Sequence, residues 1–320
     1  MNKLSIGCHV SAAGGVWNAP KNAADLKCEV FQIFTRPPMG GPAPKLTDEI
    51  IEKFKEEMAK YYPLPSPPRE GREGNKKYNS SPLRGEVRRG CEFVVHTPYF
   101  INFGSAKPRI YHGSVSVVRE ELERASLLGA KYVMTHLGSS KDLGQEKAFK
   151  QTKQGLKEVL KGYKGSTEFL LEIAAGAGSV IGDTFEELAE LMEDLVKLKG
   201  FGGICFDTQH AFSGGYDLRN DASVLSTFGK FDKAIGLKWL KMSHMNDSKP
   251  DLGERKDRHD HIGEGKIGKK GFEAILGFFS SPPSFLKRGQ GEFPLILETK
   301  HDKVKIDIKI LKSLRESLGK

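Results

Sequence analysis

The chain has 320 residues, of which 50 are lysine or arginine and 41 are aspartate or glutamate, so its formal net charge is +9. Its 38% hydrophobic and 28% charged residues are typical of a water-soluble globular protein and exclude a disordered chain. No apolar run approaches the roughly 18 residues that a membrane-spanning helix requires, and the N-terminus lacks the apolar core of a signal peptide. The surplus of positive charge favours a polyanionic partner only weakly, because a total does not show where the charges lie.

Eight short apolar runs alternate with amphipathic segments along the chain. They lie near residues 4–8, 29–34, 92–96, 131–136, 168–172, 203–206, 237–243 and 294–298. Each run is followed by a segment long enough for a helix, and this alternation predicts a parallel sheet. Eight such units close most economically into a (β/α)8 TIM barrel, with the active site at the C-terminal ends of the strands. A doubly wound open sheet is the alternative, but no G-x-G-x-x-G motif follows the first run.

Two of the predicted helices have recognisable starts. Thr47 precedes a segment whose apolar residues recur at helical spacing, namely Ile50, Phe54 and Met58. Asp183 is a good N-cap for another helix, in which Glu186 completes a capping box. The buried face of that helix is predicted to comprise Leu188, Leu191, Met192 and Leu195.

Two segments interrupt the pattern. Residues 63–90 and 280–293 are rich in proline, glycine and serine and show no hydrophobic period, so we interpret them as loop insertions in a single domain of residues 1–320. Their mutual resemblance suggests a translated repetitive DNA element. Each interrupts a helix-to-strand connection, which in a barrel lies opposite the active site. Because they carry net charges of +4 and +1, more than half of the surplus charge is predicted to lie away from that site.

The cysteines indicate the compartment. Cys8, Cys28, Cys91 and Cys205 are scattered along the chain and form no C-x-x-C pair. We therefore expect reduced cysteines in a cytoplasmic protein, rather than a disulfide framework or a zinc ribbon.

Six consecutive runs, the third to the eighth, each end in a residue that can bind a metal ion. These residues are His96, His136, Glu172, Asp207 (with His210 three positions later), His244 and Glu298. A single residue of this kind is usually only a hydrogen-bonding group. Six at one end of a barrel are different, because their crowded carboxylates would repel one another without a counter-charge, so the cluster predicts divalent metal. Histidine nitrogen and carboxylate oxygen without cysteine favour zinc, with manganese or iron as alternatives.

The loop after the seventh run carries further candidates. Asp257 and His259 are two positions apart and face the same way in extended chain, so together with His210 they form a possible additional metal site. Taken alone, this loop is better interpreted as a solvated polar turn. His261 and Glu264 either bind metal or only hold the loop, and we assign no role to the histidines at 112 and 301.

Three long motifs resemble one known family. They are IGCHVSAAGG at 6–15, DTQHAFSGGYD at 207–217, and DRH through IGEGKIG at 257–268. They are similar to endonuclease IV, the zinc-dependent apurinic/apyrimidinic endonuclease family, and the resemblance runs from about residue 5 to the C-terminus apart from the two insertions. It implies a (β/α)8 barrel with three divalent metal ions, zinc in the first instance, with manganese as an alternative at one site.

The resemblance also implies a ligand set and a reaction. The first metal is matched by His96 and His136, the second by Asp207, His244 and Glu298, the third by His210, Asp257 and His259, and Glu172 bridges the first two. The implied catalytic residues are Glu172 and Glu298. Hydroxide between two metals attacks phosphorus in double-stranded DNA 5′ to an abasic site, leaving a 3′-hydroxyl and a 5′-deoxyribose phosphate, and blocked 3′ ends are also trimmed.

Four residues correspond to DNA-contacting loops of this family. Tyr99 and Phe100, just beyond His96, resemble its DNA-penetrating loop, although both rings could instead pack in the barrel mouth. The loop that follows Phe34 and Thr35 departs from the family, because Met39 stands where an arginine that enters DNA is typical. Either Arg36 takes the place of that arginine, or Met39 acts as an apolar wedge.

Two other functions fit parts of the pattern. A sugar isomerase or epimerase of the related xylose-isomerase-like barrels gathers the same residue types, but for one or two metals. An inactive DNA-binding homologue, damaged by the insertions, is the second. The nuclease is favoured over the isomerase by the additional set of His210, Asp257 and His259. It is favoured over the inactive homologue because every metal ligand of the family has a matching residue here. A closed barrel without exposed sheet edges predicts a monomer.

Overall fold

The computed structural model describes residues 3–63, 91–281 and 292–318. Within these ranges eight parallel strands close into a barrel in the order β1-β10-β7-β6-β5-β4-β3-β2. Each strand overlaps one of the eight predicted runs, so the predicted barrel is confirmed. The strands are β1 (Lys3–His9), β2 (Val30–Ile33), β3 (Glu92–His96), β4 (Tyr132–Thr135), β5 (Glu168–Glu172), β6 (Phe201–Asp207), β7 (Leu240–His244) and β10 (Glu292–Leu297).

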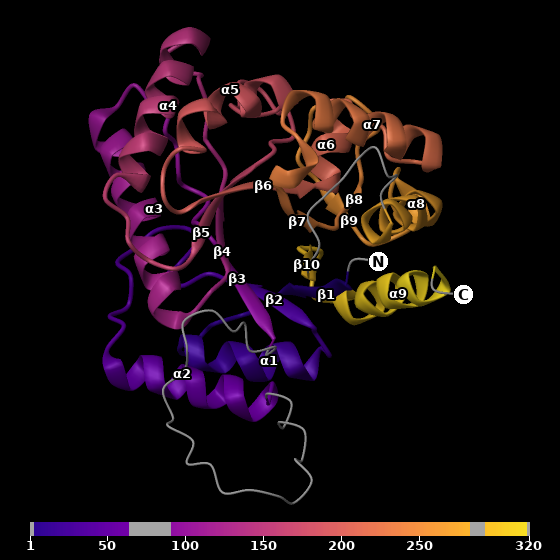
Figure 1. Ribbon diagram of the computed structural model, residues 1–320, viewed down its shortest axis with the longest axis horizontal. Helices are drawn as coiled ribbons and strands as arrows, with labels where there is room; N and C mark the ends of the chain where they lie inside the picture. Colours follow the sequence, from indigo (N-terminus) through magenta and orange to yellow (C-terminus); the bar gives the residue numbers. More distant parts are fainter. Residues whose placement is uncertain (1–2, 64–90, 282–291, 319–320) are drawn as a thin grey trace, which may run out of the picture.

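Helices surround the strands and follow one another around the barrel (Figure 1). They are α1 (Ala19–Asp25), α2 (Asp48–Tyr61), α3 (Pro108–Leu128), α4 (Gln145–Leu160), α5 (Phe185–Leu195), α6 (Thr208–Gly214), α7 (Asp221–Ala234), α8 (Gly268–Ser280) and α9 (Val304–Ser317). Thr47, which precedes the predicted helical spacing, caps α2: its side chain accepts a hydrogen bond from the Ile50 amide. A short antiparallel hairpin of β8 (Asp247–Ser248) and β9 (His259–Asp260) lies between β7 and α8 in the chain. Of the described helices, none combines the length and apolarity needed to cross a bilayer.

The barrel interior is filled by a separate apolar cluster. Side chains alternate between the two faces of a strand, so every second residue points inward. The inward residues form one buried cluster, made of Val30, Val94, Tyr132, Met134, Leu170, Cys205, Met242 and Ile296. Their neighbours, such as Phe31, Phe93, Val95 and Val133, belong instead to the larger core, which the outer helices cover. These side chains fill the interior as an apolar plug, so the barrel is not a channel.

The start of α5 differs from the prediction. Thr184, not Asp183, is the N-cap, and its hydroxyl accepts a hydrogen bond from the Glu187 amide (3.1 Å). The capping box predicted with Glu186 is wrong for the same reason, because the frame is shifted by one residue. Asp183 instead forms an ion pair with Arg255, 72 positions away in the chain. A long-range charge partner, which local sequence cannot show, decides the role of Asp183.

The two predicted insertions fall almost entirely outside the described residues. The described flanks show that one follows α2, which ends at Tyr61, and precedes β3. The other follows α8, which ends at Ser280, and precedes β10. Both therefore connect a helix to the N-terminal end of a strand, opposite the end that carries the polar side chains. Their status as insertions in one domain stays a prediction.

Candidate metal centre

A layer of polar side chains lies directly above the apolar plug. On seven of the eight strands, the residue two positions beyond an inward core residue is polar, and the alternation of a strand makes it point inward too. These residues are Gln32, His96, His136, Glu172, Asp207, His244 and Glu298. The six predicted strand-end residues are thus brought together, and Gln32 joins them.

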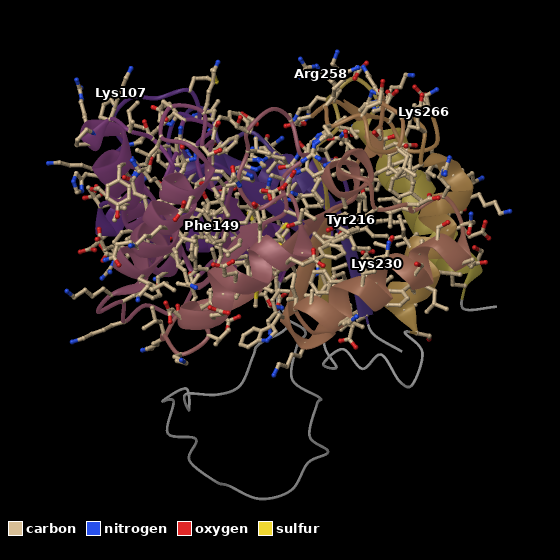
Figure 2. The ribbon with its side chains drawn as sticks, turned by 90° about the horizontal axis from the view of Figure 1, so that it is seen from above. Lys107, Phe149, Tyr216, Lys230, Arg258 and Lys266 are labelled. Carbon is tan, nitrogen blue, oxygen red and sulfur yellow. The ribbon has the colours of Figure 1, made fainter. Side chains whose placement is uncertain are left out.

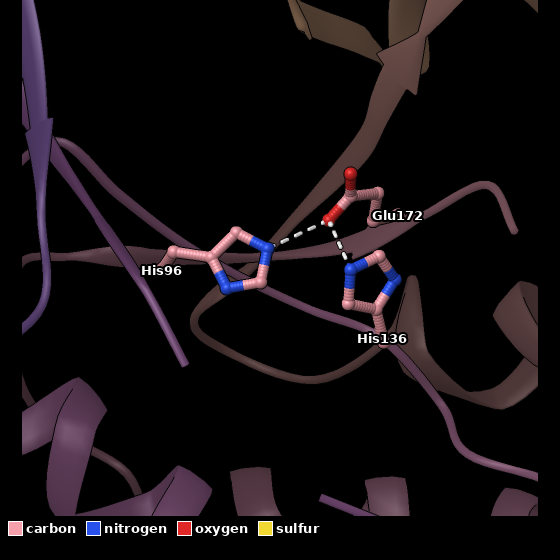
Figure 3. Close-up of side chains that lie close together, drawn as sticks. All are labelled: His96, His136 and Glu172. Carbon is pink, nitrogen blue, oxygen red and sulfur yellow. Dashed lines mark hydrogen bonds and ion pairs between the residues drawn. The ribbon is translucent and has the colours of Figure 1, made fainter. Parts of the chain in front are cut away.

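Glu172 lies at the centre of this layer. Its Oε2 atom is 3.0 Å from His96 Nε2 and 3.7 Å from His136 Nε2. Figure 3 draws these three side chains and the two contacts. Its Oε1 atom is 2.8 Å from His244 Nδ1 and 3.6 Å from His210 Nδ1. A buried carboxylate whose two oxygens face different imidazoles is placed to bridge two cations.

A second group surrounds His244. One donor atom from each of Glu172, Asp207, His244 and Glu298 lies within 4.8 Å of the others. His244 Nδ1 is 3.4 Å from Glu298 Oε2 and 3.7 Å from Asp207 Oδ2. Three carboxylates around one imidazole carry an excess of negative charge that a divalent cation would neutralise.

A third group lies nearer the surface. Donor atoms of Asp207, His210 and His259 lie within 4.8 Å of one another, and Asp257 Oδ1 is 3.5 Å from His210 Nε2 and 3.6 Å from His259 Nε2. The Nε2 atom of His259 is buried and has no hydrogen-bond partner among the described residues. The structure thus brings the predicted His210, Asp257 and His259 together, and it places Asp207 beside them as well.

The spacing of these atoms fits metal ligation. Ligand atoms that share a tetrahedral zinc ion at roughly 2.0–2.2 Å are about 3.4 Å apart, which is longer than an ordinary N–H···O hydrogen bond of about 2.7–3.2 Å. Six nitrogen–oxygen pairs in the cluster are separated by 3.4–3.7 Å. Together with the unpartnered His259 nitrogen, this spacing shows that the residues fit divalent ions.

Hydrogen bonds behind two histidines determine which ring nitrogen faces the cluster. His96 Nδ1 donates to the Thr97 carbonyl (2.6 Å), and His210 Nδ1 donates to the Ile173 carbonyl (2.9 Å). His96 therefore presents Nε2 to Glu172, and His210 presents Nε2 to Asp257. Backbone acceptors of this kind fix the tautomer of a metal-binding imidazole before the ion arrives.

His244 is held the opposite way round by Gln32, a residue that the sequence reasoning missed. His244 Nε2 donates to Gln32 Oε1 (2.8 Å), so Nδ1 faces the carboxylates. The Gln32 amide in turn donates to Glu298 Oε1 (2.6 Å) and contacts His9 Nδ1 (3.1 Å). Burial lowers the pKa of His9 to about 4, so His9 stays neutral and accepts. The signal that could have revealed Gln32 is that it is a lone polar residue at an inward-facing position of an apolar run.

Charge within the cluster shifts several pKa values. Burial alone would raise the pKa of Glu172, but the charges of His136 and His244 hold it well below its usual range. Burial would lower the pKa of His210, but Asp207 and Asp257 raise it to about 10. Without metal, protonated imidazoles therefore supply the positive charge that the carboxylates need. Metal binding would release these protons.

Asn246 is another residue that the sequence reasoning missed. Its amide donates to Asp207 Oδ2 (2.7 Å), and its carbonyl accepts from the Glu298 backbone amide (2.8 Å). Asp207 Oδ1 meanwhile accepts from the His210 amide (2.9 Å) at the start of α6. One side chain after β7 thus connects the ends of β6 and β10, which each carry a candidate ligand.

Asp247 holds the loop that carries Asp257 and His259. Its buried carboxylate accepts 2.8–3.3 Å hydrogen bonds from five backbone amides, those of Ser248, Gly263, Gly265, Ile267 and Gly268. A Cβ atom at Gly265 would lie 2.5 Å from Asp247 Oδ1, so only glycine fits there. The glycine-rich motif at 262–268 therefore closes the loop around this carboxylate.

His261 and Glu264 hold the same loop and lie outside the metal groups. His261 Nδ1 donates to Asp307 Oδ2 (2.7 Å) on α9, and Glu264 pairs with Lys303 (2.7 Å). Asp307 also accepts from the hydroxyl of Thr299 (2.7 Å), the residue after Glu298. Of the two roles that the sequence left open for His261 and Glu264, the structural one fits this geometry.

Comparison with known proteins identifies the family. Residues 84–280 match the family model described as xylose isomerase-like TIM barrel. A protein named probable endonuclease 4 from Nitrosopumilus maritimus is 36% identical over 98% of this chain and 99% of its own length. Another of that name, from Campylobacter concisus, is 35% identical over 97% of this chain and 98% of its own length. The chain belongs to the endonuclease 4 family.

Solved structures agree with this assignment. The crystal structure of endonuclease IV from Thermus thermophilus is 27% identical, with a TM-score of 0.75 over 99% of this chain and 100% of that one. A D-tagatose 3-epimerase-like protein, 19% identical with a TM-score of 0.67, shares only the fold. The sugar epimerase alternative therefore receives no support beyond the common barrel.

A cavity of about 670 Å³ opens beside the metal centre of this endonuclease 4 family member. His96, His136, His210, Asp257, His259 and Glu298 form the metal-facing side. The remaining lining includes small or aliphatic residues, among them Ala174, Ala175, Ala177, Val180 and Ile181. The candidate ligands thus line a pocket that small and aliphatic side chains also line.

Tyr99, Phe100 and Met39 project at the rim of the barrel mouth. Their side chains are 61%, 40% and 83% exposed, respectively. The two loops are joined, because the Tyr99 amide donates to the Pro38 carbonyl (3.1 Å), and the Tyr99 ring packs edge-on against Phe34 at 5.3 Å. The alternative that both aromatic rings are buried in the mouth is not what the structure shows.

Arg36 lies beneath its loop instead of at the surface. Its buried guanidinium bonds Glu121 (2.6 Å) and pairs with Glu120 (2.8 Å), both on α3. Neighbouring Arg124 donates to the carbonyls of Thr35 and Pro44, each at 2.7 Å. These contacts anchor the loop to α3. In this arrangement Arg36 does not take the place of the missing arginine. Met39 remains the candidate for DNA contact at the tip of the loop.

Cys205 lies close to the centre but differs chemically from the other groups. Its sulfur is within 4.8 Å of donor atoms of Glu172 and His244. Burial raises the pKa of the Cys205 thiol to about 12, and the side chain belongs to the apolar plug. The thiolate is the form that binds metal, so the expected ligand set without cysteine is kept.

Proposed function

We propose that this protein is a DNA-repair endonuclease that hydrolyses the phosphodiester 5′ to abasic sites in double-stranded DNA. It leaves a 3′-hydroxyl and a 5′-deoxyribose phosphate, and it also trims blocked 3′ ends. The observation that carries the proposal is the convergence of nine imidazoles and carboxylates on one face of the barrel. Membership of the endonuclease 4 family supports the substrate class.

The nine side chains would hold three divalent ions, zinc in the first instance and manganese as an alternative at one site. His96 and His136 belong to the first, Asp207, His244 and Glu298 to the second, and His210, Asp257 and His259 to the third, with Glu172 between the first two. Zinc ions held there lower the pKa of bound water to about 7 and stabilise negative charge on a phosphoryl group.

Glu172 and Glu298 are the catalytic carboxylates of this proposal. Glu172 is fully buried, with His96 and His244 hydrogen-bonded to its two oxygens. Glu298 has Oε1 bound by Gln32, which leaves Oε2 facing His244 Nδ1. Groups held in this way need little rearrangement as charge develops on the phosphate. Such preorganised groups stabilise the developing charge of a transition state most effectively.

The cavity beside the metal centre would receive the abasic nucleotide. Extruding a nucleotide from a duplex costs least where no base pairs or stacks. Ala174, Ala175 and Ala177 in the lining would offer an apolar surface to a deoxyribose, while the metal ligands of the same cavity would face its phosphate. Selectivity then comes from the lower cost of extrusion at damaged positions.

The exposed Met39, Tyr99 and Phe100 side chains would occupy the space left in the DNA stack. Apolar and aromatic wedges that enter base steps stabilise bent DNA at the cost of unstacking. The backbone hydrogen bond between Tyr99 and Pro38 holds the two loops as one unit. Met39 would act where other family members typically use an arginine.

Replacing Tyr99 with alanine is expected to lower kcat/KM roughly tenfold or more on an abasic duplex, because stacking on an aromatic ring is worth roughly 1–3 kcal/mol. Met39→Ala should act in the same direction. Both losses should shrink on a substrate whose abasic site faces an unpaired bubble, since less unstacking is then required. Leu127→Ala, at a side chain of α3 that is 55% exposed, is the matched control. Equal losses on duplex and bubble would contradict the wedge role.

The proposed function is tested by incision of a labelled duplex that contains one tetrahydrofuran abasic analogue. Zinc-loaded protein should cut only 5′ to the analogue and leave a 3′-hydroxyl that a polymerase extends. Elemental analysis should give about three metal ions per chain, whereas a related sugar epimerase would hold one or two. Chelation should abolish cutting, and zinc should restore it. No incision by metal-replete protein would refute the proposal.

A further inference from the structure

A second cleft, of about 350 Å³, lies on the other side of the metal centre. Asp257, His259 and Glu298 line both this cleft and the larger cavity, so the two are adjacent across the candidate ligands. The remaining lining residues are Lys249, Arg258, Asp260, His261 and Lys300. We call it the lysine cleft.

Three cations of the lysine cleft lack an acidic partner. Within the described part of the chain, no carboxylate lies within ion-pairing distance of Lys249, Arg258 or Lys300; the Arg258 guanidinium donates only to the Asp257 carbonyl (2.6 Å). Nearby cations in the same segments are paired instead: Arg255 with Asp183, Lys256 with Glu254, Lys266 with Asp251 and Lys303 with Glu264. The three cations that line the cleft are therefore available to an external anion.

The backbone holds two of these cations side by side. The Lys249 amide donates to the Arg258 carbonyl (3.1 Å), directly beyond the β8–β9 pairing of Ser248 with His259. The Asp247 carboxylate ties the same segment to the backbone at 263–268. The cations therefore sit on a hydrogen-bonded hairpin, and less conformational entropy is lost when they bind. Figure 2 shows Arg258 at the upper edge of the molecule, on the same side as Lys266.

The charge of the cleft favours an anion once metal is present. Asp257 and Glu298 belong to the metal centre, so the bound ions neutralise their charges. Asp260 is the remaining carboxylate of the lining, against three cations. A guanidinium with two ammonium groups is a typical phosphate-binding set.

We propose that the lysine cleft binds the DNA phosphate next to the scissile one, on the damaged strand. This inference rests on the proposed function. The strand would enter the large cavity with the extruded nucleotide, place the scissile phosphate at the metal ligands, and continue into the cleft. Lys249, Arg258 and Lys300 act in binding and register, and no bond is made or broken there.

Single alanine variants of Lys249, Arg258 and Lys300 test the cleft in the zinc-loaded protein. We expect KM for the abasic duplex to rise while kcat stays within about twofold, because the cations bind the phosphate equally in the ground and transition states. The slope of log KM against log salt should change by about 0.9 for each phosphate that the variant no longer neutralises. Lys266→Ala, on the same loop but paired with Asp251, should leave both quantities unchanged.

A methylphosphonate scan identifies the phosphate. Duplexes are prepared with one neutral linkage at each position flanking the abasic analogue, and each is tested with wild-type protein and Arg258→Ala. At one linkage next to the scissile bond, the effects of the variant and of the neutral linkage should be less than additive, because each removes the same interaction. Additive effects at every linkage would overturn the proposal, as would competition by inorganic phosphate with no linkage dependence.

Two controls keep the outcomes separate. The zinc content of Arg258→Ala must equal that of wild type, since Arg258 lies between Asp257 and His259 in the chain. If wild-type protein fails to incise, the proposed function fails. If it incises and the three variants keep wild-type KM and salt slope, the cleft inference alone fails.

Discussion

Glu172→Gln should reduce incision of an abasic duplex by at least about 10³-fold, the order expected when a preorganised charge is lost from a catalytic centre. The carboxylate places one oxygen toward His96 and His136 and the other toward His244. An amide keeps the shape but turns one acceptor into a donor and removes the charge. We therefore also expect the metal content to fall, as measured by elemental analysis of dialysed protein.

The same strand supplies the control for this variant. Glu168 begins β5 and is exposed, so Glu168→Gln changes the same functional group at the opposite end of the strand. It should retain wild-type incision and metal content. Full activity in Glu172→Gln with all metals bound would show that Glu172 bridges nothing and would remove the basis of the proposed mechanism.

Asp247→Ala should abolish metal binding at the third site while leaving the barrel folded. Five backbone amides lose their acceptor, and each amide left buried without a partner costs about 1–3 kcal/mol. The loop can escape this cost by opening to water, which takes Asp257 and His259 away from His210. We expect one fewer metal ion per chain, and faster proteolysis within residues 249–266, with little change in circular dichroism.

Asp251→Asn is the matched control for Asp247→Ala. Asp251 lies on the same loop, is exposed, and pairs with Lys266 across 3.6 Å. A surface pair of this kind is worth about 0–1 kcal/mol, so metal content and proteolysis should not change. If Asp247→Ala kept three metal ions and normal protease resistance, the loop would be held by its other contacts, those of His261 and Glu264.

The candidate ligands could be found from the sequence because the alternation of a strand and the topology of a barrel indicate the same residues. An apolar run with period two ends in a polar residue, and the barrel topology then places all such ends on one face. His96, Glu172 and Asp207 each stand two positions after an inward core residue. The same rule applied to Val30 would have revealed Gln32, which was overlooked because glutamine is not a typical metal ligand.

Residues whose partners lie far along the chain could not be assigned in this way. Asp183 has the local signature of a helix cap, yet it pairs with Arg255. Arg36 was a candidate for DNA contact, but Glu121 on α3 binds its guanidinium in the protein interior. In both cases a buried or partly buried charge takes the best counter-charge available in three dimensions, and no local pattern encodes which residue that is.

The sequence by itself determined the barrel, the eight strand positions and the residues that gather at their C-terminal ends, because hydrophobic alternation depends only on neighbours in the chain. Only the tertiary structure decided that Asp207 lies beside both the second and the third group, which histidine nitrogen faces inward, and how Asp247 closes the loop around the third group. It also decided that three cations of the lysine cleft remain unpaired within the described part of the chain. These properties depend on distances between strands and loops, which are set when the barrel closes and brings distant charges within a few ångströms.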